Sequence, residues 1–541
     1  MNDLLIRGAA VYDGTGAPGR VEDVAVKDGR IASPGPAREI IDAGGLALMP
    51  GIIDVHTHYD AQVTWDPKLS PSPALGVTTA ILGNCGFGIA PCPKRQRETV
   101  LKNLSVVEGM DLNALLNGTR WEFETFAEYL DALERIGPYA NVGVLAGHST
   151  IRSAVMGEEA SSRRKPTQEE LKQMQDVVRQ ALADGAAGFA SSFSPNHSGW
   201  GGRPMPSTIC EDDELRALVE PLKEAAKGVF VVAAGSKATP EYLEQMAAET
   251  GRPMFMVTVL TMHTDSFPGR AMDYYRRCGE ALARGREVYI HANCQPLSFD
   301  FTLKEPYPFM ALAAFDRVKA AKPEDLAAIY ADPAFRQAFR DSLKHPKAGV
   351  LFSGDWSKVE VEGVPIPQLA GGKDPLDWFC EQPLDRQMIA KLFQNDDAGV
   401  APLLKHEAGV LALSDAGAHL IYFCDAGFGL HFLAHWVRET GAFTMEEGVR
   451  RLTQDPARKY RIPDRGEIRA GAFADLLLFD PKAVGLSNLR RVRDLPGGGA
   501  RMIREPRGVH GVWVNGVRVH DGQDYAALRH GPGRVLREYG R

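Results

Sequence analysis

Two histidines end the stretch Pro50-Gly51-Ile52-Ile53-Asp54-Val55-His56-Thr57-His58. The apolar, β-branched run after Pro-Gly indicates a buried strand. Side chains two residues apart lie on the same face of a strand, so His56 and His58 can both reach one metal ion. Imidazole nitrogen is a common ligand of zinc. The spacing therefore predicts a metal site at the end of this strand.

Cys85 and Asp415 are further candidate ligands, because each follows another apolar run that indicates a strand. A thiolate at Cys85, in the tight loop Gly83-Asn84-Cys85-Gly86, could approach a metal, although a buried inert cysteine is the alternative. A carboxylate at the end of a buried strand, such as Asp415, is a poor structural residue unless it is paired or binds metal. In a metal hydrolase it also takes the proton of the attacking water, so Asp415 is the predicted catalytic base.

Four more histidines follow predicted strands or lie in the loops after them: His148, His197, His291 and His419. Each could contact substrate, and a hydrogen-bonded structural histidine is the alternative for each. Arg152 is a candidate partner for a carboxylate of the substrate. These five residues form the predicted substrate-binding set.

The elements that must position these side chains alternate along the chain. Apolar runs that indicate strands span 52–55, 78–82, 142–146, 188–191, 229–233, 253–259, 287–291 and 410–413. Helical patterns separate them, with a capping box at Thr167–Glu170 and Pro240 at a first helical position. Eight strand–helix units predict an α/β fold, a (β/α)8 barrel over 49–464 with its site at the carboxyl ends of the strands. Helical patterns at about 302–350 interrupt the alternation and predict an insertion.

Both ends of the chain read as short strands separated by turns that contain glycine and aspartate. Such strands cannot bury both faces alone and need partners. We therefore predict a small β-sandwich domain built from residues 1–48 and 465–541 together.

Composition limits the classes of partner. The 541 residues carry a formal net charge of -7 and no long basic run, which argues against nucleic acid and against an anionic membrane surface. No apolar window is long enough to span a membrane. Seven cysteines without regular spacing, and an N-terminus unlike a signal peptide, predict a cytoplasmic location. We expect a small molecule as substrate and a homo-oligomeric state.

Taken together, the motifs resemble the D-aminoacylase branch of the amidohydrolase superfamily, the N-acyl-D-amino-acid deacylases. The matching stretches are 51–60, Gly83-Asn84-Cys85-Gly86, 147–152, Ser414-Asp415 with His419, and 464–475. The resemblance implies a barrel with a β-sandwich and hydrolysis of a carbon–nitrogen bond at a metal, usually zinc. It also implies metal-ligand roles for His56, His58, Cys85 and Asp415, with Asp415 as general base.

Two departures from this family change the expected site. Family members place Thr-His at the end of the fifth strand, where this chain reads Val232-Ala233-Ala234-Gly235. They place Ser-His and then a lysine at the sixth, where this chain reads Val257-Thr258-Val259-Leu260. The histidines of the family's other metal position are absent, so we expect one zinc ion rather than two. The missing lysine removes an anchor for a substrate carboxylate, so the substrate is an N-acyl amino acid or a more apolar amide.

The leading hypothesis is therefore a metal-dependent hydrolase of linear amides. One alternative is a cyclic-amide or lactone hydrolase on the same scaffold. A deaminase is disfavoured because the fifth strand lacks a histidine ligand. The other alternative, favoured by the losses at the fifth and sixth strands, is a catalytically inactive amidohydrolase-like binding protein.

Overall fold

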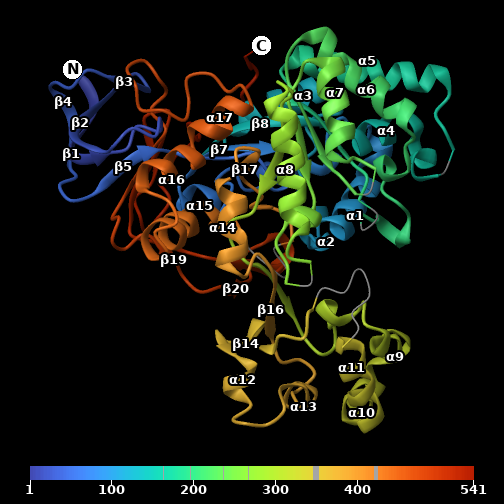
Figure 1. The fold of residues 1–541 in the computed structure, drawn as a ribbon. Coiled ribbons are helices and arrows are strands. Elements are labelled where there is room, and N and C mark those ends of the chain that lie inside the picture. Colours follow the sequence, from blue (N-terminus) through green and yellow to red (C-terminus); the bar gives the residue numbers. More distant parts are fainter. Residues whose placement is uncertain are drawn as a thin grey trace. The chain divides into compact units, whose positions relative to one another are not determined.

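The computed structural model describes residues 1–162, 164–194, 197–235, 237–265, 267–344, 352–419 and 425–540 (Figure 1). The chain divides into two compact units. The larger comprises Met1–Thr261, Met272–Cys294 and Leu403–Arg541, and the smaller comprises Met262–Ala271 and Gln295–Pro402. None of the helices in the described ranges is both long and apolar enough to cross a membrane.

An eight-stranded sheet forms the centre of the larger unit. Its strands are β6 (Ile52–Asp54), β7 (Val77–Leu82), β8 (Asn141–Gly147), β9 (Gly188–Ser192), β10 (Val229–Ala233), β11 (Met254–Val257), β12 (Val288–Ala292) and β17 (Gly409–Leu411). They lie in chain order, and each neighbouring pair is parallel. A single parallel bridge between Thr57 and Ala416 joins the first strand to the last. The predicted (β/α)8 barrel is therefore confirmed.

The helices around this sheet begin at the predicted signals. Thr167 caps α5 (Gln168–Asp184) with a complete capping box, and Thr239 caps α7 (Pro240–Thr250). Three acidic residues occupy the first turn of α6 (Asp212–Ala225), where the positive end of the helix dipole stabilises their negative charge. In Figure 1 these three helices lie side by side along the sheet.

The other helices of the barrel region lie in the connections between strands. They are α1 (Arg97–Val107), α2 (Leu112–Gly118), α3 (Phe126–Ile136), α4 (His148–Met156), α8 (Arg270–Ala283), α14 (Asp397–Lys405), α15 (Phe428–His431), α16 (Met445–Leu452) and α17 (Gln454–Lys459). A π-helical segment, Phe432–Glu439, follows α15.

A second eight-stranded sheet joins the two ends of the chain. Its strands are β1 (Asn2–Val11), β2 (Arg20–Lys27), β3 (Arg30–Ala32), β4 (Ala37–Asp42), β5 (Ala47–Pro50), β18 (Leu476–Phe479), β23 (Val509–Val514) and β24 (Val517–His520). The C-terminal strand β18 pairs antiparallel with the N-terminal strand β5. Leu4, Ile6, Val26, Leu478 and Trp513 belong to one buried apolar cluster. This sheet confirms the predicted β domain made from both chain ends.

Four short strands lie between β18 and β23. They form two separate antiparallel pairs, β19 (Gly485–Leu486) with β22 (Pro506–Arg507) and β20 (Arg490–Val492) with β21 (Arg501–Ile503). The Gly-rich turn at residues 497–499 connects β20 to β21.

The smaller unit contains residues 302–344 of the predicted insertion at about 302–350, and its last residues, 345–350, lie outside the described residues. Its antiparallel sheet has the order β13 (Leu297–Phe301), β16 (Met388–Phe393), β14 (Val359–Val361), β15 (Val364–Pro365). Its helices are α9 (Asp316–Ala320), α10 (Leu326–Ala331), α11 (Pro333–Lys344), α12 (Ile366–Leu369) and α13 (Pro375–Cys380). Strands after residue 350 pair with β13, so this unit extends beyond the predicted insertion. Phe309, Phe339, Trp356 and Phe379 pack together in it.

Candidate metal centre

Three of the predicted ligands come together at the carboxyl ends of β6 and β7. His56, His58 and Cys85 each offer one donor atom, and these atoms lie within 4.8 Å of one another. Asp415, after β17, joins them because its Oδ1 lies 3.2 Å from His56 Nε2 and 3.6 Å from His58 Nε2. We call these four residues the metal cluster. Two imidazoles, a thiol and a carboxylate are the donors that zinc prefers in proteins.

Exposure differs sharply among these four side chains. His56, His58 and Cys85 are buried, with relative exposures of 1%, 2% and 7%. The Asp415 side chain is 20% exposed, so it is the member of the cluster that water and substrate can reach. This accessibility matches the predicted task of a base better than a purely structural role.

Unusual backbone conformations place two of the ligands. Cys85 has a φ of 54° and Asp415 a φ of 47°, both in the left-handed region. Such conformations are uncommon for residues other than glycine and concentrate at functional sites. Asp60 also fixes the Cys85 loop, because its Oδ2 accepts a hydrogen bond of 3.2 Å from the Gly83 N–H.

Burial and local charge set the protonation of the cluster. Burial raises the pKa of Cys85 to about 11, so its thiol keeps the proton without a cation beside it. Burial also works to raise the pKa of Asp415, but hydrogen bonds from His56 and His58 hold that pKa well below its usual value. A zinc ion would displace the thiol proton, and the ionised Asp415 already supplies a negative donor. The residues present therefore fit zinc.

A chain of buried hydrogen bonds holds His56. Its Nδ1 lies 3.0 Å from His291 Nδ1, and His291 Nε2 lies 2.9 Å from the Tyr460 hydroxyl. Burial lowers the pKa of His291 well below its usual value, so its ring is neutral and one nitrogen can accept. With a metal ion in the cluster, the His56 Nδ1–H would donate to His291 and Nε2 would give its lone pair to the metal, in place of the hydrogen bond that it donates to Asp415 without one.

Glu108 is a site residue that the sequence analysis missed. It follows the last residue of α1, is 3% exposed, and has Oε1 at 3.6 Å from His58 Nδ1. Its Oε2 lies 3.4 Å from His419 Nε2, and its carbonyl oxygen accepts the His419 N–H at 2.6 Å. Burial raises the pKa of Glu108 to about 7. Because it follows a helix and no apolar strand, no sequence pattern pointed to it.

His197 and His419 lie at the same end of the barrel. The His419 side chain is 20% exposed, and burial lowers its pKa to about 4. Burial, with the nearby His419, also lowers the pKa of His197 to about 3. His197 Nδ1 lies 2.7 Å from Ser192 Oγ, and its ring meets Phe87 edge-on. Both rings are therefore neutral at physiological pH.

His148 and Arg152 belong to a different cluster. His148 Nδ1 lies 2.8 Å from Ser191 Oγ, and its Nε2 lies 3.0 Å from Glu214 Oε1. Arg152 pairs with the other oxygen of Glu214 and donates to the carbonyls of Ala160 and Arg164. We call Ser191, His148, Glu214 and Arg152 the closed network, since none is more than 3% exposed. This burial argues against the predicted substrate contacts of His148 and Arg152.

In the part of the chain that the structure describes, the ends of β10 and β11 offer no metal ligand. Ala234 follows β10 and Thr258 follows β11, and neither side chain carries a donor that zinc prefers. The N–H of Ala234 bonds to the carbonyl of Val257 at 2.9 Å, so the two strand ends pair directly.

An eight-stranded parallel barrel with two histidines, a cysteine and an aspartate at its strand ends defines a metal-dependent hydrolase of the α/β-barrel class. A sequence model described as the Amidohydrolase family matches residues 39–338 and 400–520. This chain belongs to that family.

Individual proteins resemble the chain over nearly its whole length. It is 29% identical to an N-acyl-D-aspartate deacylase of Alcaligenes xylosoxydans xylosoxydans, over 99% of this chain and 95% of the relative. It is 28% identical to a D-aminoacylase of the same organism, over 99% and 97%. A solved D-aminoacylase structure superposes with a TM-score of 0.67 at 25% identity, covering 99% of this chain and 100% of that one.

These matches confirm two predictions from the sequence. The resemblance to the D-aminoacylase branch is confirmed, and so is the functional class, an amidohydrolase that cleaves the carbon–nitrogen bond of a linear amide with a metal.

Proposed function

We propose that this chain hydrolyses an N-acyl amino acid or a related apolar amide with one zinc ion held by His56, His58, Cys85 and Asp415. The observation that carries the proposal is the convergence of these four side chains at one end of the barrel. A zinc ion held there would polarise the scissile carbonyl and would lower the pKa of the attacking water.

Asp415 is the proton carrier of the reaction. Its pKa lies well below the usual value, so the carboxylate is ionised and can accept the proton of the attacking water. Its partial exposure lets it face both water and the substrate nitrogen. Asp415 then returns the proton to the leaving nitrogen, which completes cleavage of the amide.

The remaining residues of the site hold and orient the proposed metal ligands and the substrate. His291 and Tyr460 fix the ring of His56, and Glu108 faces the ring of His58. Histidine ligands of metals usually donate their second nitrogen to such a partner, which fixes ring orientation and raises basicity. His419, partly exposed and next to Glu108, is placed to contact the substrate, and His197 lines the same end of the barrel.

A single zinc ion is the proposal because β10 and β11 end in Ala233 and Val257, with no further ligand there. The solved D-aminoacylase has a binuclear centre with activation by one metal and attenuation by the second. In that enzyme one metal ion activates the reaction, which supports the proposal of a single zinc ion here.

Metal analysis with a base variant tests the proposal. We expect purified protein to contain about one zinc per chain and to hydrolyse N-acyl amino acids, and Asp415→Asn to lower kcat by about 10²–10⁴-fold. Cys92→Ala is the matched control, since Cys92 is buried but stands outside the metal cluster. Full activity in Asp415→Asn would refute the base assignment. Zinc without hydrolysis of any amide would favour a binding protein.

Three further predictions from the sequence stand as proposals. The six cysteines in the described ranges are free, which supports a reducing compartment such as the cytoplasm. We retain the domain boundaries at 48/49 and 464/465. We also retain the homo-oligomeric state.

A further inference from the structure

The ring of His197 is held between the end of β9 and the loop that carries Cys85. Its Nδ1 lies 2.7 Å from Oγ of Ser192, the last residue of β9. Its other neighbour is Phe87, whose ring it meets edge-on with the two ring centroids 5.1 Å apart. Phe87 follows Cys85 by two residues, and Cys85 lies in a helical turn that packs against β9. One loop therefore supplies both a proposed metal ligand and a wall for the His197 ring.

Hydrogen bonds fix which nitrogen of the His197 ring carries the proton. Ser192 is fully buried, and its Oγ accepts the Ser194 N–H at 3.1 Å. A buried hydroxyl hydrogen needs an acceptor, and within the described ranges Nδ1 of His197 is the one acceptor that this hydroxyl reaches. The Ser192 hydroxyl therefore donates to Nδ1, which leaves the proton of the neutral ring on Nε2. The ring is neutral because burial lowers the pKa of His197 to about 3.

The Nε2–H of His197 lies near the metal cluster. Burial is the main cause of the lowered pKa of this ring, and the charge of His419 is the next. The charges of His58, Asp415 and His56 also act on it, so the ring lies within electrostatic reach of the metal cluster. Among the described residues, no hydrogen bond involves its Nε2. An N–H at a half-buried position is costly unless water or a ligand accepts it, so this one is available to a ligand.

His148 of the closed network is arranged similarly, but both of its ring nitrogens are occupied. Its Nδ1 faces Ser191 Oγ and its Nε2 faces Glu214. Ser191 and Ser192 are successive residues of β9, so their side chains point to opposite faces of the strand. Ser192 therefore orients the His197 ring on the side away from the closed network, and no described side chain holds Nε2 of His197 as Glu214 holds that of His148.

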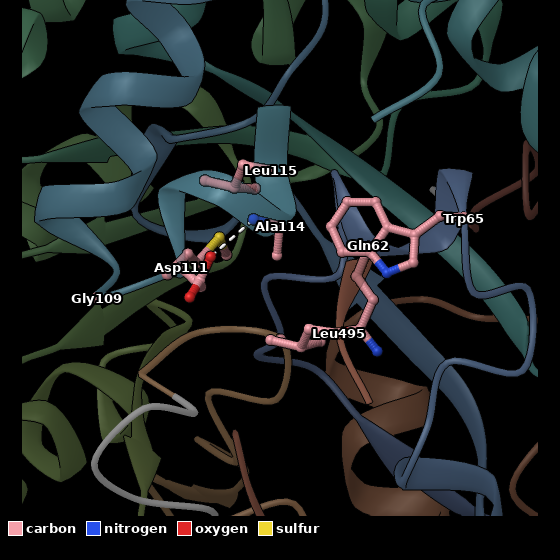
Figure 2. Close-up of a pocket in the computed structure, with 9 residues that line it drawn as sticks. Gln62, Trp65, Gly109, Asp111, Ala114, Leu115 and Leu495 are labelled. Atoms are coloured by element: carbon pink, nitrogen blue, oxygen red, sulfur yellow. Dashed lines mark hydrogen bonds between the residues drawn. The ribbon is translucent and has the colours of Figure 1, made fainter. Parts of the chain in front are cut away.

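The pocket beside α2 in Figure 2 lies outside this arrangement. Trp65, Leu115 and Leu495 are among the residues that line it, whereas His197 and the four members of the metal cluster are not. A ligand of the metal cluster is therefore expected to meet His197 rather than this pocket.

Hydrolysis of an amide builds negative charge on the carbonyl oxygen when water adds to the carbonyl carbon. A fixed, neutral N–H stabilises this charge, because it bonds more strongly to the charged oxygen than to the carbonyl of the ground state. We propose that His197 is a further catalytic residue, whose Nε2–H donates a hydrogen bond to the carbonyl oxygen of the scissile amide as the charge develops. This role rests on the proposed function. His197 keeps its proton throughout, and the proton of the water still passes through Asp415 to the leaving nitrogen.

Kinetics of two variants test this role with the zinc-loaded full-length protein and the best substrate among N-acetyl-D-alanine, N-acetyl-D-leucine and N-acetyl-D-aspartate. His197→Phe keeps a ring against Phe87 but removes the N–H, so kcat should fall about 10²–10³-fold while KM changes less than about threefold. His197→Gln places an amide N–H near the position of Nε2, and its kcat should lie within about tenfold of the wild type. Wild-type kcat in His197→Phe, or the same large loss in both variants, would overturn the proposal.

His520→Phe is the matched control. The His520 ring is also buried, meets the Tyr525 ring edge-on and accepts a hydrogen bond at Nδ1, yet it lies in β24 of the sheet that joins the chain ends. Its kcat should equal that of the wild type. All three variants should also keep the wild-type zinc content, because neither histidine is a proposed ligand. Loss of zinc from both His197 variants would overturn the proposal, since it would assign His197 to the metal instead.

Binding of a tetrahedral analogue separates failure of this proposal from failure of the proposed function. The probes are the methylphosphonamidate analogues of the same three compounds, in which a tetrahedral anionic phosphorus group replaces the acetyl carbonyl. The Kd of the tightest analogue should rise about 10²–10³-fold in His197→Phe and stay near the wild-type value in His197→Gln and His520→Phe.

If the wild type hydrolyses none of the amides, the proposed function fails, and the same difference in Kd would still support a hydrogen bond from His197 to the tetrahedral group. Equal Kd values in the wild type and His197→Phe, or no binding of any analogue to the wild type, would overturn the proposal.

Discussion

The metal cluster and the closed network are both histidine clusters at strand ends of one barrel, yet they differ in how their polar atoms are used. In the closed network both ring nitrogens of His148 have hydrogen-bond partners, and the guanidinium of Arg152 is bound to Glu214 and two carbonyls. In the metal cluster, the donor atoms of His56, His58 and Cys85 face one another instead. A satisfied network stabilises a fold, whereas facing lone pairs are suited to a cation.

The closed network also shows that a familiar arrangement need not be catalytic. Ser191, His148 and Glu214 follow the serine–histidine–acid order of hydrolase triads. Ser191 has no exposed surface, however, so no substrate can reach its hydroxyl. Access, rather than residue type, separates the two clusters, because Asp415 of the metal cluster is 20% exposed.

The largest expected effect comes from removing a ligand of the metal cluster. His58→Asn should leave the protein folded but without stoichiometric zinc and without measurable hydrolysis, because it deletes one of the three buried donors. Elemental analysis and an activity assay on the same preparation measure both. Retention of about one zinc per chain together with activity would remove His58 from the ligand set.

A substitution in the closed network should instead lower the stability of the folded protein. Glu214→Gln leaves the buried guanidinium of Arg152 without its charge partner, which should lower the free energy of unfolding by about 3–5 kcal/mol. Urea unfolding measures it, with Glu224→Gln as the control, since Glu224 pairs with Arg179 at the surface. The zinc content of the folded variant should equal that of the wild type.

The pH dependence of this effect has a definite sign. Burial opposes ionisation of Glu214, but His148 and Arg152 outweigh it and lower its pKa below the usual 4.5. A lowered pKa in the folded state gives stability that is present above about pH 4.5 and is lost as the pH falls through the folded value. The stability gap between the wild type and Glu214→Gln should therefore narrow in acid. A constant gap down to pH 3 would contradict the charge argument.

Replacing Glu108 should have an effect of intermediate size, and this effect should be limited to zinc binding by the metal cluster. Glu108→Gln keeps the shape of the side chain but removes the charge facing His58, and we expect zinc affinity to fall about 10–100-fold. Competition with a chelator measures the Kd. Glu98→Gln serves as control on α1, the helix that Glu108 follows, because Glu98 pairs with Lys102 at the surface. Equal affinities in the two variants would show that Glu108 does not hold His58.

The smallest effect is expected from Ser191→Ala. It removes one hydrogen bond to His148, so the free energy of unfolding should fall by about 1 kcal/mol while kcat stays unchanged. Parallel unfolding and kinetic measurements check both parts. A fall in kcat comparable to that of Asp415→Asn would mean that the closed network takes part in catalysis. The contrast between a structural closed network and a catalytic metal cluster would then be wrong.

The sequence predicted the features that depend on local or periodic patterns of residues. Alternating apolar runs located every barrel strand, capping residues such as Thr167 located helix starts, and the spacing of His56 and His58 located the cluster. Glu108 and Tyr460 could not be predicted, because they reach the site only through tertiary packing. His148 looked much like His56 in the sequence, since both follow a strand, and only their neighbours distinguish them.

The metal cluster takes its residues from both sides of the seam between the first and last barrel strands, so it bears on how the barrel closes. The described backbone contacts there are few, namely the Thr57–Ala416 bridge and the bond of 2.7 Å from the His58 N–H to the Ala416 carbonyl. The Ser414 hydroxyl donates to the His56 carbonyl across a separation of 358 residues. Contacts between such distant residues form late in folding, because closing a long loop costs entropy. A zinc ion held by the proposed ligands, which come from both sides of this seam, would add to the few contacts that close the barrel and would stabilise the folded state.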